Sequence, residues 1–325
     1  MFKRSSITGI SLDASGLVAL ADLSTIAQRT ALTGTASFLD ILILAPGIHR
    51  HQAASEVNGR ELPITGAMTT GYVFRIENQA TVSYLQKIGR PGRLVNVLVK
   101  ERATRPFGVQ WFKVKFLTGG AAASVLYHLI VVLTVITMTL LLVIRDWWAV
   151  SVLLMLMFAR IINVVVIKQR IVMGWKGAAE VGVQGDLLVL LSQDRWVRML
   201  GLVDDLKAVT SGQWLRDETT IEGFATSFAT LLVYVSAALA SNASTIGSFF
   251  IVCLMLVSVA LLGLCNSLTD CLQMFGRIVT TTGESKRYER RLDMAKELVE
   301  SSQRDDWAIG LGLILPGDRA KKVSV

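Results

Sequence analysis

The apolar residues of this chain concentrate in two long blocks, near residues 121–167 and 224–266. Arg145 and Asp146 divide the first block into two runs, and a short polar stretch around Asn242 divides the second. At about 1.5 Å per residue, each run approaches or exceeds the ~30 Å hydrocarbon core of a bilayer. The pattern therefore predicts four membrane spans in two tight helical hairpins, over residues 121–144, 147–167, 224–241 and 246–266.

Basic residues flank these spans on one side. They stand before the first span, after the second and after the fourth, whereas the tips of the hairpins hold a single arginine. Because positively charged loops stay in the cytoplasm, this asymmetry predicts that both termini are cytoplasmic, in a plasma membrane or an endomembrane. The flanking residues are Arg102, Arg105, Lys113 and Lys115; Lys168, Arg170 and Lys176; and Arg277, Lys286, Arg287, Arg290 and Arg291.

The stretches outside the spans predict a second, β-rich part. The loop over residues 168–223 has the pattern of a β-meander, with strands over 187–191, 196–203 and 206–215. Since a three-stranded sheet needs a cover, we expect strands from residues 70–100 to join it in one composite cytoplasmic domain. Those strands are expected around Tyr72, Phe74 and Ile76, around Val82 and Leu85, and over 94–99.

The expected fold is a membrane α-helical part with two transmembrane hairpins and a β-rich cytoplasmic domain, α+β overall. Helices are also expected over residues 11–28 and, with an amphipathic face, over 284–303. The predicted regions are a cytoplasmic N-terminal region over 1–120 (a helix and then strands), the first hairpin over 121–167, the cytoplasmic β-meander over 168–223, the second hairpin over 224–266, and a cytoplasmic amphipathic C-terminal region over 267–325.

Residues 36–48 form a further apolar run that is short for a membrane span and contains Asp40. The favoured interpretation is a buried strand or helix of the cytoplasmic part. The alternative is a re-entrant segment or a fifth span, which would place the first thirty or so residues on the outer side.

Composition supports the membrane class. The 325 residues have a mean hydropathy of +0.51, and 52% are hydrophobic and 18% charged, whereas soluble domains are about 25% charged. Three histidines, three cysteines and no C-x-x-C pair give no basis for a zinc site, and the absence of a Gly-Lys pair excludes a Walker A loop. We therefore expect no metal, no cofactor and no catalytic residue. The net charge of +8 is juxtamembrane, so nucleic-acid binding is not expected.

Four polar residues inside the predicted spans form a candidate intramembrane site: His128, Arg160, Asn163 and Tyr234. Ionisable groups are costly in a bilayer and often mark function. Structural explanations stand beside this hypothesis. His128 can bond a neighbouring helix, with Tyr234 as a candidate partner, and Arg160 can extend its guanidinium to the membrane surface.

Two further candidates lie next to the last span. Lys286, Arg287, Arg290 and Arg291 crowd the start of the amphipathic helix and could contact anionic lipid headgroups. Cys271 is expected at the membrane surface, where it is a candidate for lipidation.

The segment WLRDETTIEGFATSFATLLVY, over residues 214–234, resembles uncharacterised multi-pass membrane proteins of filamentous fungi. The resemblance covers residues 140–266. It implies a membrane location and supplies no activity, cofactor or catalytic residue.

Three functions agree with these patterns. The leading hypothesis is a non-enzymatic scaffold or accessory subunit with a cytoplasmic interaction domain, which forms a homo-oligomer or binds a partner membrane protein. The first alternative is an oligomeric small-molecule transporter or channel component, with His128, Arg160 and Asn163 along its pathway. The second alternative is an intramembrane enzyme acting on a lipid or terpenoid, although the paired carboxylates that would hold magnesium are missing.

Overall fold

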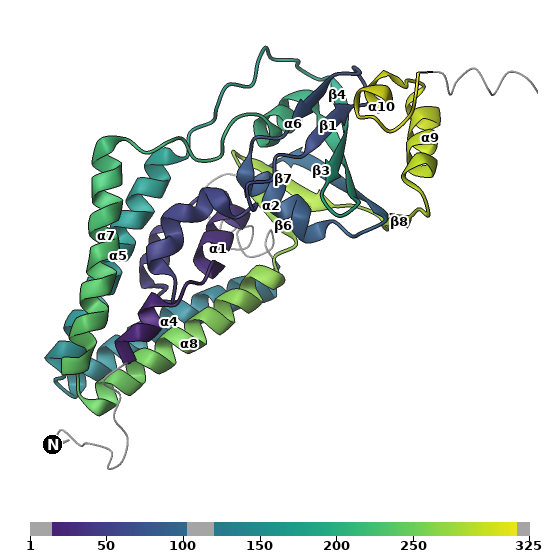
Figure 1. Ribbon diagram of the computed structural model, residues 1–325. Coiled ribbons are helices and arrows are strands. Elements are labelled where there is room, and N and C mark those ends of the chain that lie inside the picture. Colours follow the sequence, from purple (N-terminus) through teal and green to yellow (C-terminus); the bar gives the residue numbers. More distant parts are fainter. Residues whose placement is uncertain (1–14, 103–119, 317–325) are drawn as a thin grey trace, which may run out of the picture. The chain divides into compact units, whose positions relative to one another are not determined.

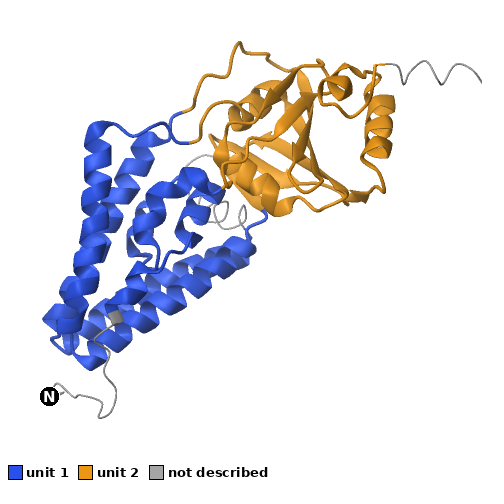
Figure 2. Ribbon diagram, viewed as in Figure 1, with its two compact units in different colours: residues 1–57, 105–172, 215–270 blue, residues 58–104, 173–214, 271–325 orange. Residues whose placement is uncertain are grey.

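The computed structural model describes residues 15–102 and 120–316, and these divide into two compact units (Figure 2). The helical unit comprises residues 1–57, 105–172 and 215–270 within the described range. The sheet unit comprises residues 58–104, 173–214 and 271–325 within the same range. Each unit is therefore assembled from three separate stretches of the chain.

Four helices of the helical unit are long and apolar enough to cross a membrane. They confirm the predicted helices to within a few residues, and together with the separate sheet they give the chain an α+β composition. Polar caps mark their boundaries. Asp146 accepts a hydrogen bond from the amide of Ala149, and Thr219 and Glu222 form a capping box. The helices are α4 Ala121–Val143, α5 Trp147–Arg170, α7 Thr220–Leu239 and α8 Thr245–Ser267.

The four helices form a V rather than two closed hairpins (Figure 1). α4 packs along α8 and α5 packs along α7, so the two helices of each predicted hairpin diverge from their shared turn. The turns, residues 144–146 and 240–244, are called the tips. They meet at the closed end, where Asp146 Oδ2 accepts hydrogen bonds from the amide and the hydroxyl of Ser244 at 2.9 and 2.5 Å. The prediction of tight turns is confirmed, whereas that of tightly packed hairpins is wrong.

Residues 15–57 fill the space inside the V. η1 contacts α7 and α8, η2 contacts α4 and α5, η3 contacts α5 and α7, and α1 contacts α8. Ile43, Leu44 and Ala45 are buried in the same hydrophobic core as the four helices. The elements are η1 Ser15–Leu20, α1 Thr25–Thr33, η2 Phe38–Leu42 and η3 Ile48–Glu56.

This placement corrects two predictions. Residues 15–57 belong with the long helices, so 1–120 is not one region, and residues 36–48 are not part of the sheet domain. The physical reason is that the run around Leu44 is apolar on every side. This run is therefore most stable where apolar side chains surround it on all sides, as they do inside the V.

The sheet unit contains one mixed sheet with the order β2-β1-β4-β5-β3-β7-β6, and β8 also pairs with β3. β3 runs parallel to β5 and antiparallel to β7. Strands from both sides of α4 and α5 thus share a sheet, as predicted. The described strands are β1 Ile64–Ala67, β2 Val73–Arg75, β3 Arg93–Glu101, β4 Gln184–Leu191, β5 Arg195–Leu202, β6 Cys271–Met274, β7 Arg277–Thr281 and β8 Lys286–Arg287.

Three details of this unit differ from the sequence analysis. Val82 and Leu85 lie in helix α2, Gln79–Ile88, and the expected third meander strand is helix α6, Val203–Thr210. The C-terminal region adds three strands, β6 to β8, to the sheet before its amphipathic helix α9, Arg291–Ser302, begins. α9 and α10, Asp306–Gly310, cover one face of the sheet through a core that includes Trp196 and Trp307.

Candidate functional site

A chain of polar side chains, most of them buried, runs between the two helix pairs of the V. It joins residues 15–57, which we call the irregular segment, to α4 and α5. We call this chain of side chains the polar network. Polar groups are rarely buried unless they find partners, so their bonding pattern bears directly on what this region does. The members are Thr30, Asp40, His51, Gln52, Tyr127, Arg160, Asn163, Arg170 and Glu218.

Asp40 lies at the centre of this network. The hydroxyl of Tyr127 donates to its Oδ1 at 2.6 Å, and the amide of Ser37 donates to its Oδ2 at 2.6 Å. The second bond is half of a capping box that begins η2. One carboxylate thus both starts a short helix and fixes that helix to α4.

Arg160 reaches Asp40 from α5 and is 2% exposed. Its Nε donates to the backbone carbonyl of Asp40 at 3.1 Å, and its Nη1 lies 2.7 Å from Nδ1 of His51. A guanidinium can only donate, so Nδ1 of His51 accepts and the ring proton sits on Nε2. The ring is therefore neutral.

The proton on Nε2 of His51 has a partner. Nε2 lies 2.8 Å from the hydroxyl of Thr30, which itself donates to the carbonyl of Ile26 at 3.0 Å. The series from Arg160 through His51 and Thr30 therefore ends on the backbone of α1. His51 and Thr30 each accept one hydrogen bond and donate another, and the series holds α1, η2 and η3 to α5.

A second branch follows α5 towards its C-terminus. Asn163 donates to the carbonyl of Ile48 at 3.1 Å and accepts from Gln52 at 3.0 Å. Arg170 Nη1 then contacts Glu218 Oε1 at 2.6 Å, and its Nε donates to the carbonyl of Arg216 at 2.9 Å. This branch ties η3 to the ends of α5 and α7.

The other helix pair, α4 and α8, contacts the irregular segment through further residues. Arg29 donates to Thr269 at 3.0 Å, and its guanidinium lies 5.4 Å from the centre of the Tyr127 ring. Asn266, near the end of α8, donates to the carbonyl of Thr25 at 2.8 Å. Both helix pairs are thus bonded to the same segment.

The structure brings together two of the four predicted intramembrane residues. Arg160 and Asn163 share the polar network, as their spacing on one helix face predicts. His128 Nδ1 instead pairs with the carbonyl of Ser124 in its own helix at 2.8 Å. Tyr234 is 47% exposed, and its ring lies 6.1 Å from that of His49. The proposed pairing of His128 with Tyr234 is therefore absent from the interactions of the described residues, and the four do not form one site.

From the sequence, Asp40 and His51 are not expected to share a site with Arg160. A signal for Asp40 is present, because it is a single carboxylate inside an otherwise apolar run. On its own, that carboxylate favours a place in the cytoplasmic part over burial near the spans. In fact the phenol of Tyr127 satisfies the carboxylate there.

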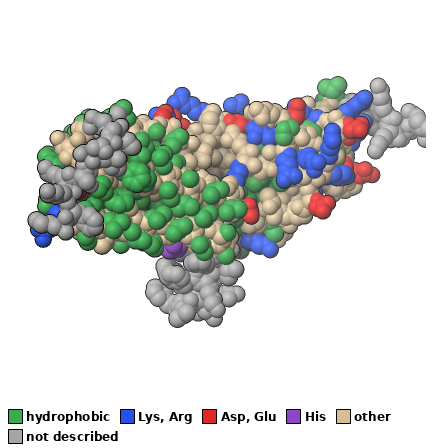
Figure 3. Space-filling view, turned by 90° about the horizontal axis from the view of Figure 1, so that it is seen from below, with side chains coloured by type: hydrophobic (Ala, Val, Ile, Leu, Met, Phe, Trp, Pro, Cys, Tyr) green, Lys and Arg blue, Asp and Glu red, His purple; other side chains and the backbone are tan. Residues whose placement is uncertain are grey.

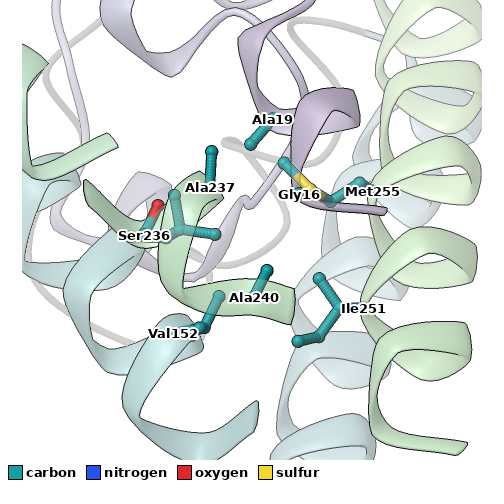
Figure 4. A pocket seen from close by; sticks show the side chains of 9 residues that line it. Gly16, Ala19, Val152, Ser236, Ala237, Ala240, Ile251 and Met255 are labelled. Atoms are coloured by element: carbon teal, nitrogen blue, oxygen red, sulfur yellow. The ribbon is translucent and has the colours of Figure 1, made fainter. Parts of the chain in front are cut away.

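A small apolar pocket lies nearer the closed end of the V (Figure 4). Gly16, Val152, Ala237, Ala240 and Ile251 are among its lining residues, and the polar network contributes none. Its volume of about 10 Å³ is at the lower limit for one water molecule. A Cβ on Gly16 would lie 2.0 Å from the carbonyl oxygen of Ala237. This region is therefore a close packing seam between η1 and α7.

The predicted surface candidates divide into two groups. Lys286 pairs with Glu297 at 2.6 Å and Arg291 pairs with Asp194, whereas Arg287 and Arg290 are exposed and have no such partner among the described residues. Cys271 is only 4% exposed, because it lies in strand β6. A buried thiol is out of reach of an acyl transferase, so the burial of Cys271 argues against it as a lipidation site.

Among the described residues, no group of three or more His, Cys, Asp and Glu side chains could hold a metal ion. Comparison with protein families, with curated proteins and with solved structures gives no match to this chain. The interpretation of the polar network thus depends on its geometry, which is that of a bonded support for an irregular segment.

Proposed function

We propose that this chain is an integral membrane protein that acts as a scaffold or accessory subunit, with the sheet unit as its partner-binding domain. The observation that carries the proposal is an open, aromatic strand edge on a domain whose chain is tied to four long apolar helices.

The outer faces of the long helices support insertion into a bilayer. Figure 3 displays hydrophobic side chains gathered over the helical unit. Exposed apolar surface on this scale is unusual for a soluble monomer and suits contact with lipid. Large exposed side chains on these helices include Val125, Leu129, Val132, Ile136, Leu154, Phe158, Ile161, Phe224, Phe228, Leu231, Phe249, Leu256 and Leu264.

The sheet supports placing all three of its chain segments on one side of the membrane. β3 precedes α4, β5 lies between α5 and α7, and β7 follows α8, yet β5 and β7 both pair directly with β3. Strands separated by a bilayer cannot share backbone hydrogen bonds. An even number of crossings between successive strands is therefore required, and the basic flanks assign this side to the cytoplasm.

The N-terminal segment supports a revision of the expected topology. η1 contacts η4, Ala240–Asn242, at the tips, with Gly16 against Ala237. By Thr25 the chain has reached the other end of the V, beside Asn266. Residues 15–57 thus enter at the tips and leave at the open end. Irregular backbone is tolerated at membrane depth only where protein encloses it, as it does here. We therefore infer that residues 15–57 cross the membrane, so that the chain before them starts on the outer side, instead of both termini being cytoplasmic.

Epitope tags at the two termini test this topology. After selective permeabilisation of the plasma membrane, we expect antibody to reach the C-terminal tag, while an N-terminal tag on the far side stays protected or is reached from outside the cell. A tag inserted after Ala243 at a tip serves as the control and should behave like the N-terminal tag. Termini that behave alike would contradict the fifth, irregular crossing.

The strand edge suited to a partner is β2. Tyr72 is 68% exposed and its ring stacks on that of Phe74, with 5.9 Å between centroids. Leu62 and Ile64 are also exposed on the neighbouring stretch of chain. β2 ends the strand order of the sheet, and an open edge with exposed aromatic residues favours addition of a strand from another protein.

Site-specific photo-crosslinking tests this edge. Tyr72 is replaced by p-benzoylphenylalanine in the full-length protein, and the exposed Lys296 of α9 receives the same group as a control. We expect one discrete adduct from position 72, weakened by Phe74→Asp, and none from position 296. An adduct of twice the chain mass would identify a second copy as the partner. Equal adducts from both positions, or none from either, would contradict the proposal.

Transport is the second candidate, and one observation favours it. Broken segments between spanning helices often build substrate sites in transporters, and ionisable residues at membrane depth are often functional. The segment holding Asp40 and His51 is of this kind. Its polar groups bond to one another, however, so a pathway would require residues 15–57 to move away from Arg160.

A further inference from the structure

We propose that four arginines of the sheet unit, Arg90, Arg93, Arg287 and Arg290, form a binding surface for the phosphate headgroups of acidic phospholipids. We call these residues the arginine cluster. The inference rests on the membrane location proposed above, because the long helices would tether the sheet unit to a bilayer. It also replaces the predicted set of four basic residues, of which only Arg287 and Arg290 remain.

Two segments far apart in the sequence meet to form the cluster. The turn over residues 89–93 leads into β3, and residues 286–290 contain β8. β8 pairs antiparallel with the start of β3, so that Arg287 lies directly opposite Arg93 (Figure 1). The amide of Tyr288 then donates to the carbonyl of Gly92 at 3.0 Å and extends the contact towards Arg90 and Arg290.

The charges of the cluster are not balanced within the described part of the chain. Like charges directly opposite each other on neighbouring strands are destabilising, yet Arg93 faces Arg287 in this way. None of the four arginines forms an ion pair with a described carboxylate, whereas neighbouring Lys286 and Arg291 do. Among the residues that the structure describes, the guanidinium of Arg93 donates to the hydroxyl of Ser285 at 3.3 Å, and this neutral partner leaves its charge in place.

The chemistry of the cluster fits phosphate. Arginine presents a planar fork of donors that matches a phosphate group, and three of the four side chains are exposed. The two stretches, GRPGR and KRYERR, contain a single acid, Glu289. Cytoplasmic leaflets carry anionic lipids, and each arginine close to such a surface strengthens binding about fivefold. Four spans in the same chain hold the effective concentration of headgroups high.

The test uses the full-length protein in nanodiscs of neutral phosphatidylcholine, titrated with dioctanoyl phosphatidylinositol bisphosphate. The variant combines Arg90→Gln, Arg287→Gln and Arg290→Gln. The matched control, Arg75→Gln, Lys100→Gln and Lys296→Gln, removes the same charge from other exposed positions of the sheet unit. We expect the cluster variant to lose at least about tenfold in affinity and the control less than about twofold. Because repulsion is relieved, the cluster variant should unfold at the same or a higher temperature than the parent.

Several outcomes would overturn the proposal. Equal losses in both variants would indicate non-specific attraction, and equal affinity for dioctanoyl phosphatidylcholine would exclude headgroup recognition. Equally tight binding of free inositol bisphosphate would identify a soluble phosphate as the ligand. Binding of an acidic protein without binding of the lipid would identify a protein as the ligand. Carbonate extraction of the parent protein reports separately on membrane insertion, so failure of the scaffold proposal is distinguishable from failure of lipid binding.

Discussion

Replacing Arg160 with Met should lower the free energy of unfolding of the helical unit by about 3–5 kcal/mol, the usual cost of removing one member of a buried charged set. The variant loses the donors to the Asp40 carbonyl and to Nδ1 of His51. Both acceptors stay buried without their partner, and the carboxylate of Asp40 loses a nearby positive charge. Met conserves most of the apolar volume, so the loss reports on polar contacts rather than on a cavity.

Thermal unfolding of the detergent-purified protein measures this loss. Arg145→Met is the matched control, because it removes the same charge from an arginine that is exposed at a tip. Arg160→Lys keeps the charge, but an ammonium group cannot reproduce the guanidinium's hydrogen bonds to both the Asp40 carbonyl and Nδ1 of His51. We therefore expect an intermediate loss of stability. Parental stability in Arg160→Met would show that the polar network does not support the fold. If that stable variant also abolished solute flux in proteoliposomes, transport would replace scaffolding as the leading function.

The long helices could be predicted because bilayer thickness and charge placement both constrain them. Charged or capping residues such as Asp146, Lys168 and Arg170 stand where the apolar runs stop, and the helices begin or end within a few residues of them. Hydropathy alone did not reveal which helix packs on which. The prediction therefore paired neighbours in sequence, whereas the structure pairs α4 with α8 and α5 with α7.

The short elements of the sheet unit were harder to predict. In α2 the apolar positions Val82 and Leu85 suit either a strand or a helix, and the cap that decides, Asn78 accepting from Thr81, is a local hydrogen bond. Asp204 and Asp205 stand between two of the strands expected from the sequence, but they lie in the first turn of α6, where acidic residues suit the helix dipole. β6 to β8 are too short to show an alternating pattern.

The polar network could be predicted only in part. Arg160 and Asn163 lie on one face of a regular helix, so their spacing places them together. Asp40 and His51 lie in separate short 3₁₀ helices, and no periodicity relates those elements to α5. Their meeting depends on how the apolar run between them packs inside the V, which is a property of the tertiary structure.

That packing depends on Gly47, and replacing Gly47 with Ala should lower the free energy of unfolding of the helical unit by about 2–5 kcal/mol. Gly47 precedes η3 with a φ of +91°, and a Cβ there would lie 2.1 Å from the carbonyl oxygen of Leu23. A left-handed conformation costs a side chain about 1–2 kcal/mol, and the overlap with fixed backbone adds to it. The stretches of backbone around Leu23 and Gly47 would have to move apart.

Gly59→Ala separates the cost of the left-handed backbone from the cost of the overlap with the Leu23 carbonyl oxygen. Gly59 has a φ of +61°, and a Cβ there would meet nothing within 4 Å, so this variant carries the backbone cost without the overlap. We expect Gly47→Ala to lower the unfolding temperature clearly more than Gly59→Ala, and to expose the neighbouring stretch around Arg50 to trypsin. Equal effects would mean that the backbone beside Leu23 yields easily. In that case residues 15–57 would be loosely held inside the V, and the case for a movable segment, and with it for transport, would become stronger.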